Sequence, residues 1–407
     1  MTMRKFDPTF NPRPVEHIEL PEGNTRPRWI IVAALLVVAA IAFGVGLSGV
    51  LNREGGWTDV EALSGAPGCA AEFSLQYCLP DKGGRAVLRE VSALYTSACT
   101  RAAQVYSAEE DFDGVGNVHS INAKPNEIVT VEPELYAALQ LVQQTGNRAV
   151  YLAPLYETYL SLFFCEDDAE TADYDPLQNP ELAESFRELA AFANDPEQID
   201  LELLGERQVR LRVAPAYLQY AQENGVGCFF DFGWMKNAFI ADDLASALKA
   251  QGFTDAVLQS VDGFGCNLSE RGDRFAMQIF DGVPKLVAEM EYAKPLSFVS
   301  MHSRSIHPGD RDWYYEFESG EVRAIYLDPA DGMPKTAIDD LLLWSGKLGC
   351  GALVLRACEA YLADAFDPAA LDAPELFCAY CEQNKLYCSD PDVQFPELLD
   401  GYQEVTP

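Results

Sequence analysis

The sequence predicts an α+β fold, because strand patterns and helix patterns mix along the chain without regular alternation. Length and composition agree with a folded domain of this class. The chain has 407 residues, enough for one large domain or two ordinary ones. Hydrophobic residues make up 48% and charged residues 23%, which is normal for a protein with a core and excludes general disorder.

The charge balance excludes one class of partner. The chain carries 29 Lys and Arg against 63 Asp and Glu, a formal net charge of −34. A surface this acidic is repelled by phosphate backbones. We therefore expect no nucleic-acid partner.

The N-terminal region predicts a membrane anchor. Ile30 to Leu51 contains no charged residue, and at about 1.5 Å per residue a helix of this length spans the hydrocarbon core of a bilayer. Trp29 stands at its start, where an aromatic ring suits the interface. The segment is preceded by the basic residues Arg4, Lys5, Arg13, Arg26 and Arg28.

This charge bias predicts a topology. It keeps residues 1–28 in the cytoplasm, makes residues 29–51 a single-pass transmembrane anchor in the cell membrane, and places the rest of the chain outside. The alternative is a cleaved signal peptide, whose apolar core is usually shorter, about 7–15 residues.

All 11 cysteines follow the anchor. Outside a membrane disulfides are allowed, so we expect either disulfides or buried thiols, and the odd count leaves at least one thiol unpaired. The tightest group is Cys378, Cys381 and Cys388. As a zinc site it lacks a clear fourth ligand.

The first half of the exported chain predicts a stalk and then mixed elements. Residues 52–85 are rich in Gly, Pro and small residues and are expected to form the stalk. A helix should begin at Pro133, a favoured first helical position, and end at Gly146. The other expected elements are a strand entering a helix over 86–106, a strand over 127–131, helical structure over 149–164, an acidic loop over 165–180, a helix over 180–193, and two strands over 199–204 and 209–213.

The second half predicts a sheet and two helices. A helix is expected over 238–250, ended by Gly252, and a second over 351–365. Strands are expected over 253–261, 295–300, 313–317, 322–327 and 338–344. Residues 366–407 are acidic and Pro-rich, and we expect them to be a tail packed over the domain.

Several familiar catalytic motifs are absent from the sequence. It contains no phosphate-binding Gly-x4-Gly-Lys-Ser/Thr loop, no Gly-x-Ser-x-Gly elbow and no His-Glu-x-x-His pair. His302 and His307 are expected to form a solvated pair in a polar loop rather than a pair of metal ligands.

Two segments carry more information, residues 231–242 and 326–334. The first places an Asp-x-Gly turn before the expected helix 238–250. Backbone N–H groups at such a turn can hold a phosphate. The alternative is a plain helix entry in which Asp242 is a cap or a surface carboxylate.

The order of these features resembles the ApbE family, the FAD:protein FMN transferases. Residues 117–122 and 129–135 are similar to the family's turn, strand and helix. Residues 231–242 align without a gap on its Asp-x-Gly-Gly-x-Ala-Lys-Gly-x-x-x-Asp motif, and residues 328–334 are similar to its Asp-Pro-x-Thr-Gly-x-Pro turn. The resemblance covers residues 86–365 and implies an ApbE-like mixed α/β domain there.

The resemblance implies a flavin site. Asp231, Gly233, Asn237 and Asp242 would bind FAD in a nucleotide-sized pocket, with Asp242 near its rim. Asp364, in Ala363-Asp364-Ala365, would be the magnesium ligand. Several family residues are replaced: the second Gly of the motif by Trp234, its Lys by Asn237, its His by Ile325, and a metal-binding Thr by Pro368.

The implied function is that of an extracytoplasmic transferase in protein flavinylation. It would move FMN from FAD, its substrate, to a Thr or Ser of a target protein and release AMP. The alternative is a catalytically impaired relative that binds flavin or a partner protein without transfer. Because magnesium needs several fixed oxygen ligands, the loss of the Thr predicts weak or absent metal-dependent transfer.

Overall fold

The computed structural model describes residues 55–405 except 66–67, 283–284 and 307–310. Contacts join Gly55–Pro407 in one compact unit. The expected anchor lies outside the described residues. Among the residues that are described, none forms a helix with both the length and the apolar character that a membrane crossing requires.

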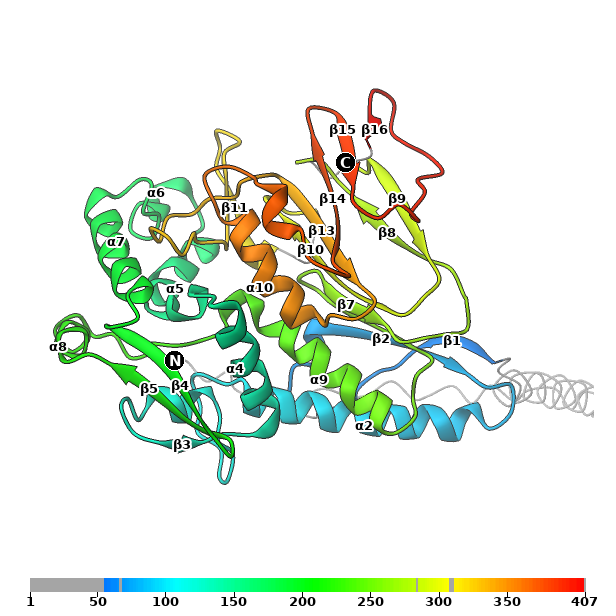
Figure 1. Cartoon of the computed structure of the whole chain (residues 1–407), viewed down its shortest axis with the longest axis horizontal. Helices are drawn as coiled ribbons and strands as arrows, with labels where there is room; N and C mark the ends of the chain where they lie inside the picture. Colours follow the sequence, from blue (N-terminus) through cyan, green and yellow to red (C-terminus); the bar gives the residue numbers. More distant parts are fainter. Residues whose placement is uncertain (1–54, 66–67, 283–284, 307–310, 406–407) are drawn as a thin grey trace, which may run out of the picture. The chain divides into compact units, whose positions relative to one another are not determined.

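A nine-stranded sheet organises the domain (Figure 1). Its strands lie in the order β1-β2-β6-β7-β10-β13-β14-β15-β16, and the neighbouring pairs are antiparallel except β15 and β16. The strands are β1 (Gly56–Asp59), β2 (Phe73–Leu79), β6 (Ala256–Ser260), β7 (Phe264–Asn267), β10 (Leu296–His302), β13 (Asp340–Ser345), β14 (Phe377–Glu382), β15 (Lys385–Cys388) and β16 (Gln403–Val405).

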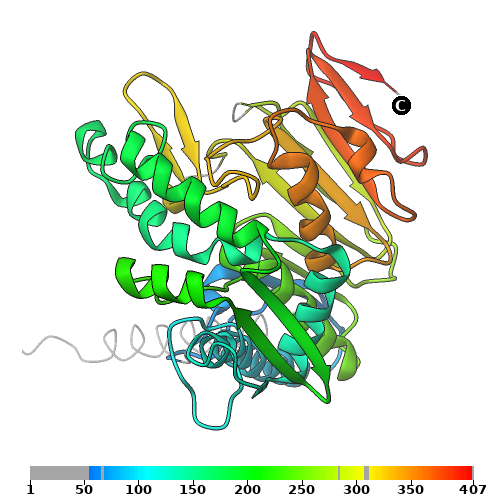
Figure 2. The same ribbon diagram turned by 60° about the vertical axis from the view of Figure 1, so that its left-hand side comes forward.

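Helices cover one face of this sheet. Helices α9 (Lys236–Ala250) and α10 (Cys350–Tyr361) pack on its central strands, and α2 (Gly84–Val105) packs on α9 (Figure 2). Val299 and Met301 of β10 point into this helix-covered core. Because side chains alternate along a strand, Phe298, Ser300 and His302 face the other side.

That other side is partly covered by a hairpin of β8 (Phe275–Ile279) and β9 (Ala288–Tyr292). Phe298, Leu342 and Trp344 form a second apolar cluster with Met277 and Met290 of the hairpin. Strands β11 (Tyr314–Glu316) and β12 (Val322–Ala324) form a second, smaller hairpin. The cavity described below lies on this hairpin side of the sheet.

The middle of the chain forms a second layer of short helices around a three-stranded sheet in the order β3-β5-β4. Pro stands at the start of α4, α5, α7 and α8, where its missing N–H costs nothing. The elements are α3 (Val118–Asn122), β3 (Val129–Thr130), α4 (Pro133–Thr145), α5 (Ala153–Tyr159), α6 (Asp168–Thr171), α7 (Pro180–Asn194), β4 (Ile199–Gly205), β5 (Gln208–Val213) and α8 (Pro215–Asn224).

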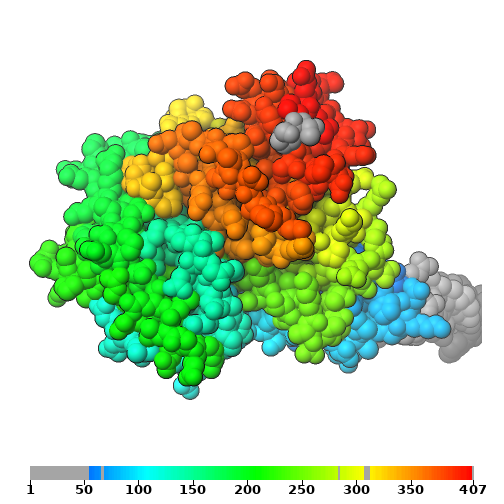
Figure 3. Space-filling model, viewed as in Figure 1, coloured from blue at the N-terminus to red at the C-terminus, as the bar shows by residue number. Residues whose placement is uncertain are grey.

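The expected mixed fold is therefore observed, but two segments correct the expected domain limits. Residues 52–85 were expected to form a stalk, yet β1 and β2 within them are strands of the main sheet. Residues 366–407 were expected to be a tail, yet β14 pairs with β13 and extends the same sheet. Figure 3 shows this C-terminal segment, red, lying against the orange residues before it.

The cysteines are thiols. All eleven lie in the described residues, none is in a disulfide, and nine are buried. Burial raises the pKa of the Cys266 thiol to about 12, so it stays protonated. No group of three His, Cys, Asp or Glu side chains able to hold a metal occurs within the described part of the chain.

Candidate functional site

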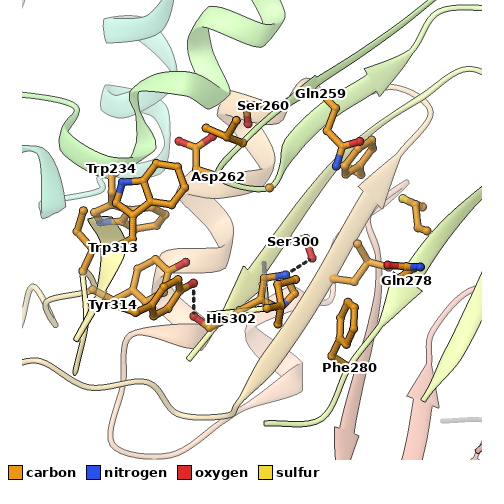
Figure 4. Close-up of a pocket in the computed structure, with 18 of the residues that line it drawn as sticks. Trp234, Gln259, Ser260, Asp262, Gln278, Phe280, Ser300, His302, Trp313 and Tyr314 are labelled. Atoms are coloured by element: carbon orange, nitrogen blue, oxygen red, sulfur yellow. Dashed lines mark hydrogen bonds between the residues drawn. The ribbon is translucent and has the colours of Figure 1, made fainter. Parts of the chain in front are cut away.

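A cavity of about 240 Å³ opens on the hairpin side of the sheet. We call it the aromatic cavity, because seven of the residues that line it are Phe, Trp or Tyr. Figure 4 shows Trp234, Trp313 and Tyr314 on one side, Phe280 and Gln278 on the other, and Ser300 and His302 between them. Its volume lies just below the usual range of small-molecule sites, about 300–1,000 Å³, so it suits one flat ring system.

The Asp-x-Gly turn places Trp234 in this wall. Gly233 has φ +53°, a left-handed conformation that favours glycine. The Asp231 side chain closes the turn by accepting from the N–H of Phe232, 2.8 Å away. Burial raises the pKa of Asp231, and nearby Lys236 opposes that shift. Trp234 then packs edge-on against Tyr326, with ring centroids 4.9 Å apart, and both rings line the cavity.

Asn237 reaches the cavity through Asp262. Its Nδ2 donates to Asp262 Oδ2 and to Glu72 Oε2, each 2.9 Å away. Asp262 lines the cavity, and burial raises its pKa to about 6. The remaining oxygens, Asn237 Oδ1 and Asp262 Oδ1, are buried and have no hydrogen-bond partner. Unsatisfied buried oxygens of this kind suit a donor supplied by a ligand or by water.

Asp242 has a different place. Its two carboxylate oxygens accept from the backbone N–H groups of Cys350 and Gly351, at 2.8 and 2.9 Å. It therefore caps the N-terminus of α10 and is not among the residues that line the aromatic cavity. A Cβ at Gly349 would lie 2.4 Å from Asp242 Oδ2, so this approach needs glycine.

Asp364 does not fit the magnesium site that was expected for it. The helix expected over 351–365 ends at Tyr361, so Asp364 lies beyond it. Its side chain is 90% exposed and pairs with Lys335 Nζ at 2.7 Å. The same Nζ lies 3.1 Å from Asp328 and 2.9 Å from Asp331. In this lysine cluster, an ammonium occupies the position between three carboxylates that a cation would need.

The protonation of Lys335 fits that role. Partial burial alone would lower the pKa of its ammonium, but hydrogen bonds to Asp364, Asp331 and Asp328 outweigh it and raise that pKa. The amine therefore stays charged at physiological pH. The residues present do not fit a magnesium ion at Asp364.

A second, polar cavity of about 220 Å³ shares Tyr326 with the first. Three basic residues line it: Arg304, Arg323 and Lys335. Arg323 is committed to Asp175 and Glu321, at 3.0 and 2.7 Å, and Lys335 to the lysine cluster. Arg304 has no ion pair among the described residues, and its Nε is buried without a hydrogen-bond partner. Arg304 is therefore the basic group best able to meet an anion.

Sequence reasoning missed the polar floor of the aromatic cavity. His302 was expected in a polar loop, but it lies on β10 with its side chain 12% exposed; His307 is outside the described residues. His302 stands opposite Asp340 in the β10–β13 register, and its Nδ1 lies 2.5 Å from Asp340 Oδ1. Ser300 Oγ lies 2.9 Å from His302 Nε2. The signal was the Ser-x-His spacing, which puts both side chains on one face of a strand.

Comparison with solved structures identifies the fold. The chain is similar to the flavin transferase ApbE from Vibrio cholerae, with a TM-score of 0.54, 13% identity, and coverage of 83% of this chain and 98% of that one. It is also similar to the ApbE protein from Thermotoga maritima, with a TM-score of 0.53, 14% identity, and coverage of 80% and 94%. No protein-family model and no curated protein matches the sequence.

These similarities confirm the resemblance in fold that the sequence motifs indicated. The chain has the ApbE fold over most of its length and is a divergent example of it. At 13–14% identity the likeness extends to the fold alone.

Proposed function

We propose that this chain binds FAD in the aromatic cavity and acts as an FAD:protein FMN transferase-like protein on the outer side of the cell membrane, anchored by residues 29–51. One observation carries the proposal. In a fold shared with a flavin transferase, a cavity sized for one ring system is walled by Trp234, Trp313 and Tyr314. Offset or edge-on packing against such rings stabilises a planar aromatic ligand.

The charges support a nucleotide with its phosphates near the polar cavity. The chain as a whole is strongly acidic, so a phosphate needs a local cation. Arg304 supplies one next to Tyr326, the residue common to both cavities. A planar guanidinium can hold a phosphate through two N–H groups. The flavin ring would lie against Trp234, Trp313 and Tyr314, and the diphosphate would run from the cavity floor at Ser300 and His302 toward Arg304.

The proposed reaction needs no redox step. A hydroxyl oxygen of the acceptor bonds to the phosphorus of the FMN half of FAD, the bridging bond to the AMP half breaks, and AMP leaves. The chain's own residues would bind the ring, position the diphosphate and accept the hydroxyl proton. His302 is the group at the cavity floor able to take that proton.

A second candidate is a relative that binds flavin or a partner protein without transfer. The lysine cluster favours it, because Asp364 is held by Lys335 and does not form a metal site. Asn237 and Ile325, which replace a lysine and a histidine of the family, favour it too.

The first test is FAD binding by the full chain, followed through quenching of flavin fluorescence. Saturable binding at one site per chain supports the proposal, and absence of binding contradicts flavin transfer and flavin binding alike, which leaves only the partner-protein form of the second candidate. Release of AMP after addition of a Thr-containing acceptor protein distinguishes transfer from binding alone.

The proposed location has its own test. Protease added to intact protoplasts should digest the chain beyond residue 52 and leave the N-terminal segment protected. Complete protection of the whole chain would contradict this topology, whatever the flavin result.

A further inference from the structure

Ser300, His302 and Asp340 form a hydrogen-bonded relay at the floor of the aromatic cavity (Figure 4 shows the first two). The sheet sets its geometry. Ser300 and His302 are two residues apart on β10, so their side chains share a face, and Asp340 faces His302 directly across the β10–β13 pair. Ser300 and His302 line the cavity, whereas Asp340 is buried behind them.

The hydrogen bonds define the direction of proton transfer. Asp340 Oδ2 accepts from the N–H of Gly282 at 2.5 Å, which leaves Oδ1 for His302. An ionised carboxylate only accepts, so His302 Nδ1 carries the ring proton and Nε2 offers a lone pair. Ser300 Oγ, 2.9 Å away, then donates to Nε2. In this arrangement a histidine removes the proton of a serine hydroxyl and makes it nucleophilic.

The histidine ring is held in place from other sides as well. Phe280 packs edge-on against it, with ring centroids 5.9 Å apart. The Tyr314 hydroxyl donates to the backbone oxygen of His302 at 3.0 Å. A fixed ring keeps Nε2 aimed at Ser300, which is what general-base catalysis requires.

The backbone around Ser300 argues against acyl transfer. The N–H of Ser300 donates to the carbonyl of Gly263 at 2.8 Å. It is therefore not free to stabilise an oxyanion, as a nucleophile's own N–H does in serine proteases. A phosphorus electrophile does not need this donor, because its charge is spread over several oxygens that a nearby cation such as Arg304 can meet.

We propose that Ser300 is itself an acceptor of the flavin, so that the chain becomes a covalent FMN protein. This inference rests on the proposed binding of FAD. Ser300 Oγ bonds to the phosphorus of the FMN half, and the bridging bond to AMP breaks. The Ser300 proton passes to His302 Nε2 and then to the departing AMP. No electron is gained or lost by any group.

The experiment uses the full chain, incubated with FAD in magnesium-containing buffer and then denatured to remove bound flavin. We expect flavin fluorescence to stay with the denatured band, one FMN on the peptide that contains Ser300, and one AMP released per flavin attached. Ser300→Ala should abolish the attachment, measured at an FAD concentration that saturates this variant. Ser297→Ala is the matched control, because Ser297 is on the same strand but on its opposite face, and it should be modified like wild type.

The relay has a separate readout. His302→Gln should slow attachment by about 100-fold or more, the usual contribution of a general base. Asp340 is a positioning residue, so Asp340→Asn should slow attachment while the dissociation constant of FAD stays unchanged.

Three results would overturn the inference. If FAD binds but no flavin stays on the denatured wild-type chain, self-modification is refuted while the proposed binding function stands. If flavin attaches equally well to Ser300→Ala, the acceptor is another residue and the assignment is wrong. Failure of FAD to bind at all would refute the proposed function together with this inference.

Discussion

The relay and the lysine cluster use the same kinds of side chain in opposite ways. In the lysine cluster, Asp328, Asp331 and Asp364 surround one ammonium, and the charges are neutralised within the chain. In the relay, Asp340 orients His302, and the line of hydrogen bonds ends at Ser300 on an open cavity. A charged group that is paired within the chain is not available to a ligand. A hydrogen-bonded relay that ends at a cavity, in contrast, leaves its last residue available to one.

Asp242 and Asp262 repeat this contrast within one segment of the fold. Burial raises the pKa of each carboxyl to about 6. Both carboxylate oxygens of Asp242 accept hydrogen bonds from the first turn of α10. In Asp262, which lines the aromatic cavity, Oδ1 has no hydrogen-bond partner. We therefore expect substitutions in the lysine cluster and at Asp242 to change the free energy of unfolding. Substitutions of residues that line the aromatic cavity should change the affinity for FAD.

The largest effect should come from the lysine cluster. Lys335→Met leaves Asp328, whose side chain is 8% exposed, buried without its cation. We expect the free energy of unfolding to fall by about 3 kcal/mol, measured by urea denaturation. Lys347→Met is the matched control, because its pair with Glu375 is exposed, and it should change stability by less than about 0.5 kcal/mol. Equal losses in both variants would contradict the role assigned to the cluster.

The helix cap should give the next largest effect. Asp242→Ala removes both acceptors from the first turn of α10, so we expect a loss of about 2 kcal/mol of stability. FAD affinity, measured at a temperature where the variant is folded, should stay near wild type. If the variant is as stable as wild type but does not bind FAD, Asp242 belongs to the binding site and its role as a cap of α10 is contradicted.

Local signals in the sequence explain how much of the fold was predicted. The helix expected over 180–193 is observed as α7 (Pro180–Asn194), since Pro180 and the capping Asn179 mark its start. The strands expected over 199–204 and 209–213 are the hairpin β4–β5. In contrast, β14 and β16 lie in residues 366–407, whose acidic, Pro-rich composition predicts a tail. These strands are stabilised by pairing with β13 and β15, which the local sequence does not indicate.

The candidate site also depends partly on strand pairing that the local sequence does not indicate. The Asp-x-Gly turn before a helix was visible in the sequence, and its neighbour Trp234 lines the cavity. The relay depended on a register between β10 and β13, whose residues are far apart in the chain. Strand β10 also extends past its expected end, to His302 instead of residue 300. No local pattern places Asp340 against His302, so only the sheet pairing could identify the relay.

The cavity wall gives a third prediction. Trp234→Ala removes one aromatic face, and we expect the dissociation constant of FAD to rise about tenfold, or about 1.4 kcal/mol. Trp57→Phe is the control, because Trp57 packs on Phe275 and is not among the cavity residues. Fluorescence titration measures both. An unchanged affinity in Trp234→Ala would contradict the placement of the flavin ring.

The smallest effect is on the pH dependence of the free energy of unfolding, to which the carboxyls of Asp242 and Asp262 both contribute. A carboxyl with a folded pKa of about 6, above its unfolded value near 4, binds a proton more tightly in the folded state. The stability this adds is fully present below about pH 4 and is lost as pH rises through 6. We expect Asp262→Asn to reduce the fall in unfolding free energy between pH 4 and 7 by about 1 kcal/mol, measured in urea at each pH. Bound FAD should alter the pH dependence of wild type and leave that of Asp262→Asn unaltered, because Asp262 faces the cavity. If FAD alters both proteins equally, the titrating group that senses the ligand is not Asp262, and its free oxygen is not part of the site.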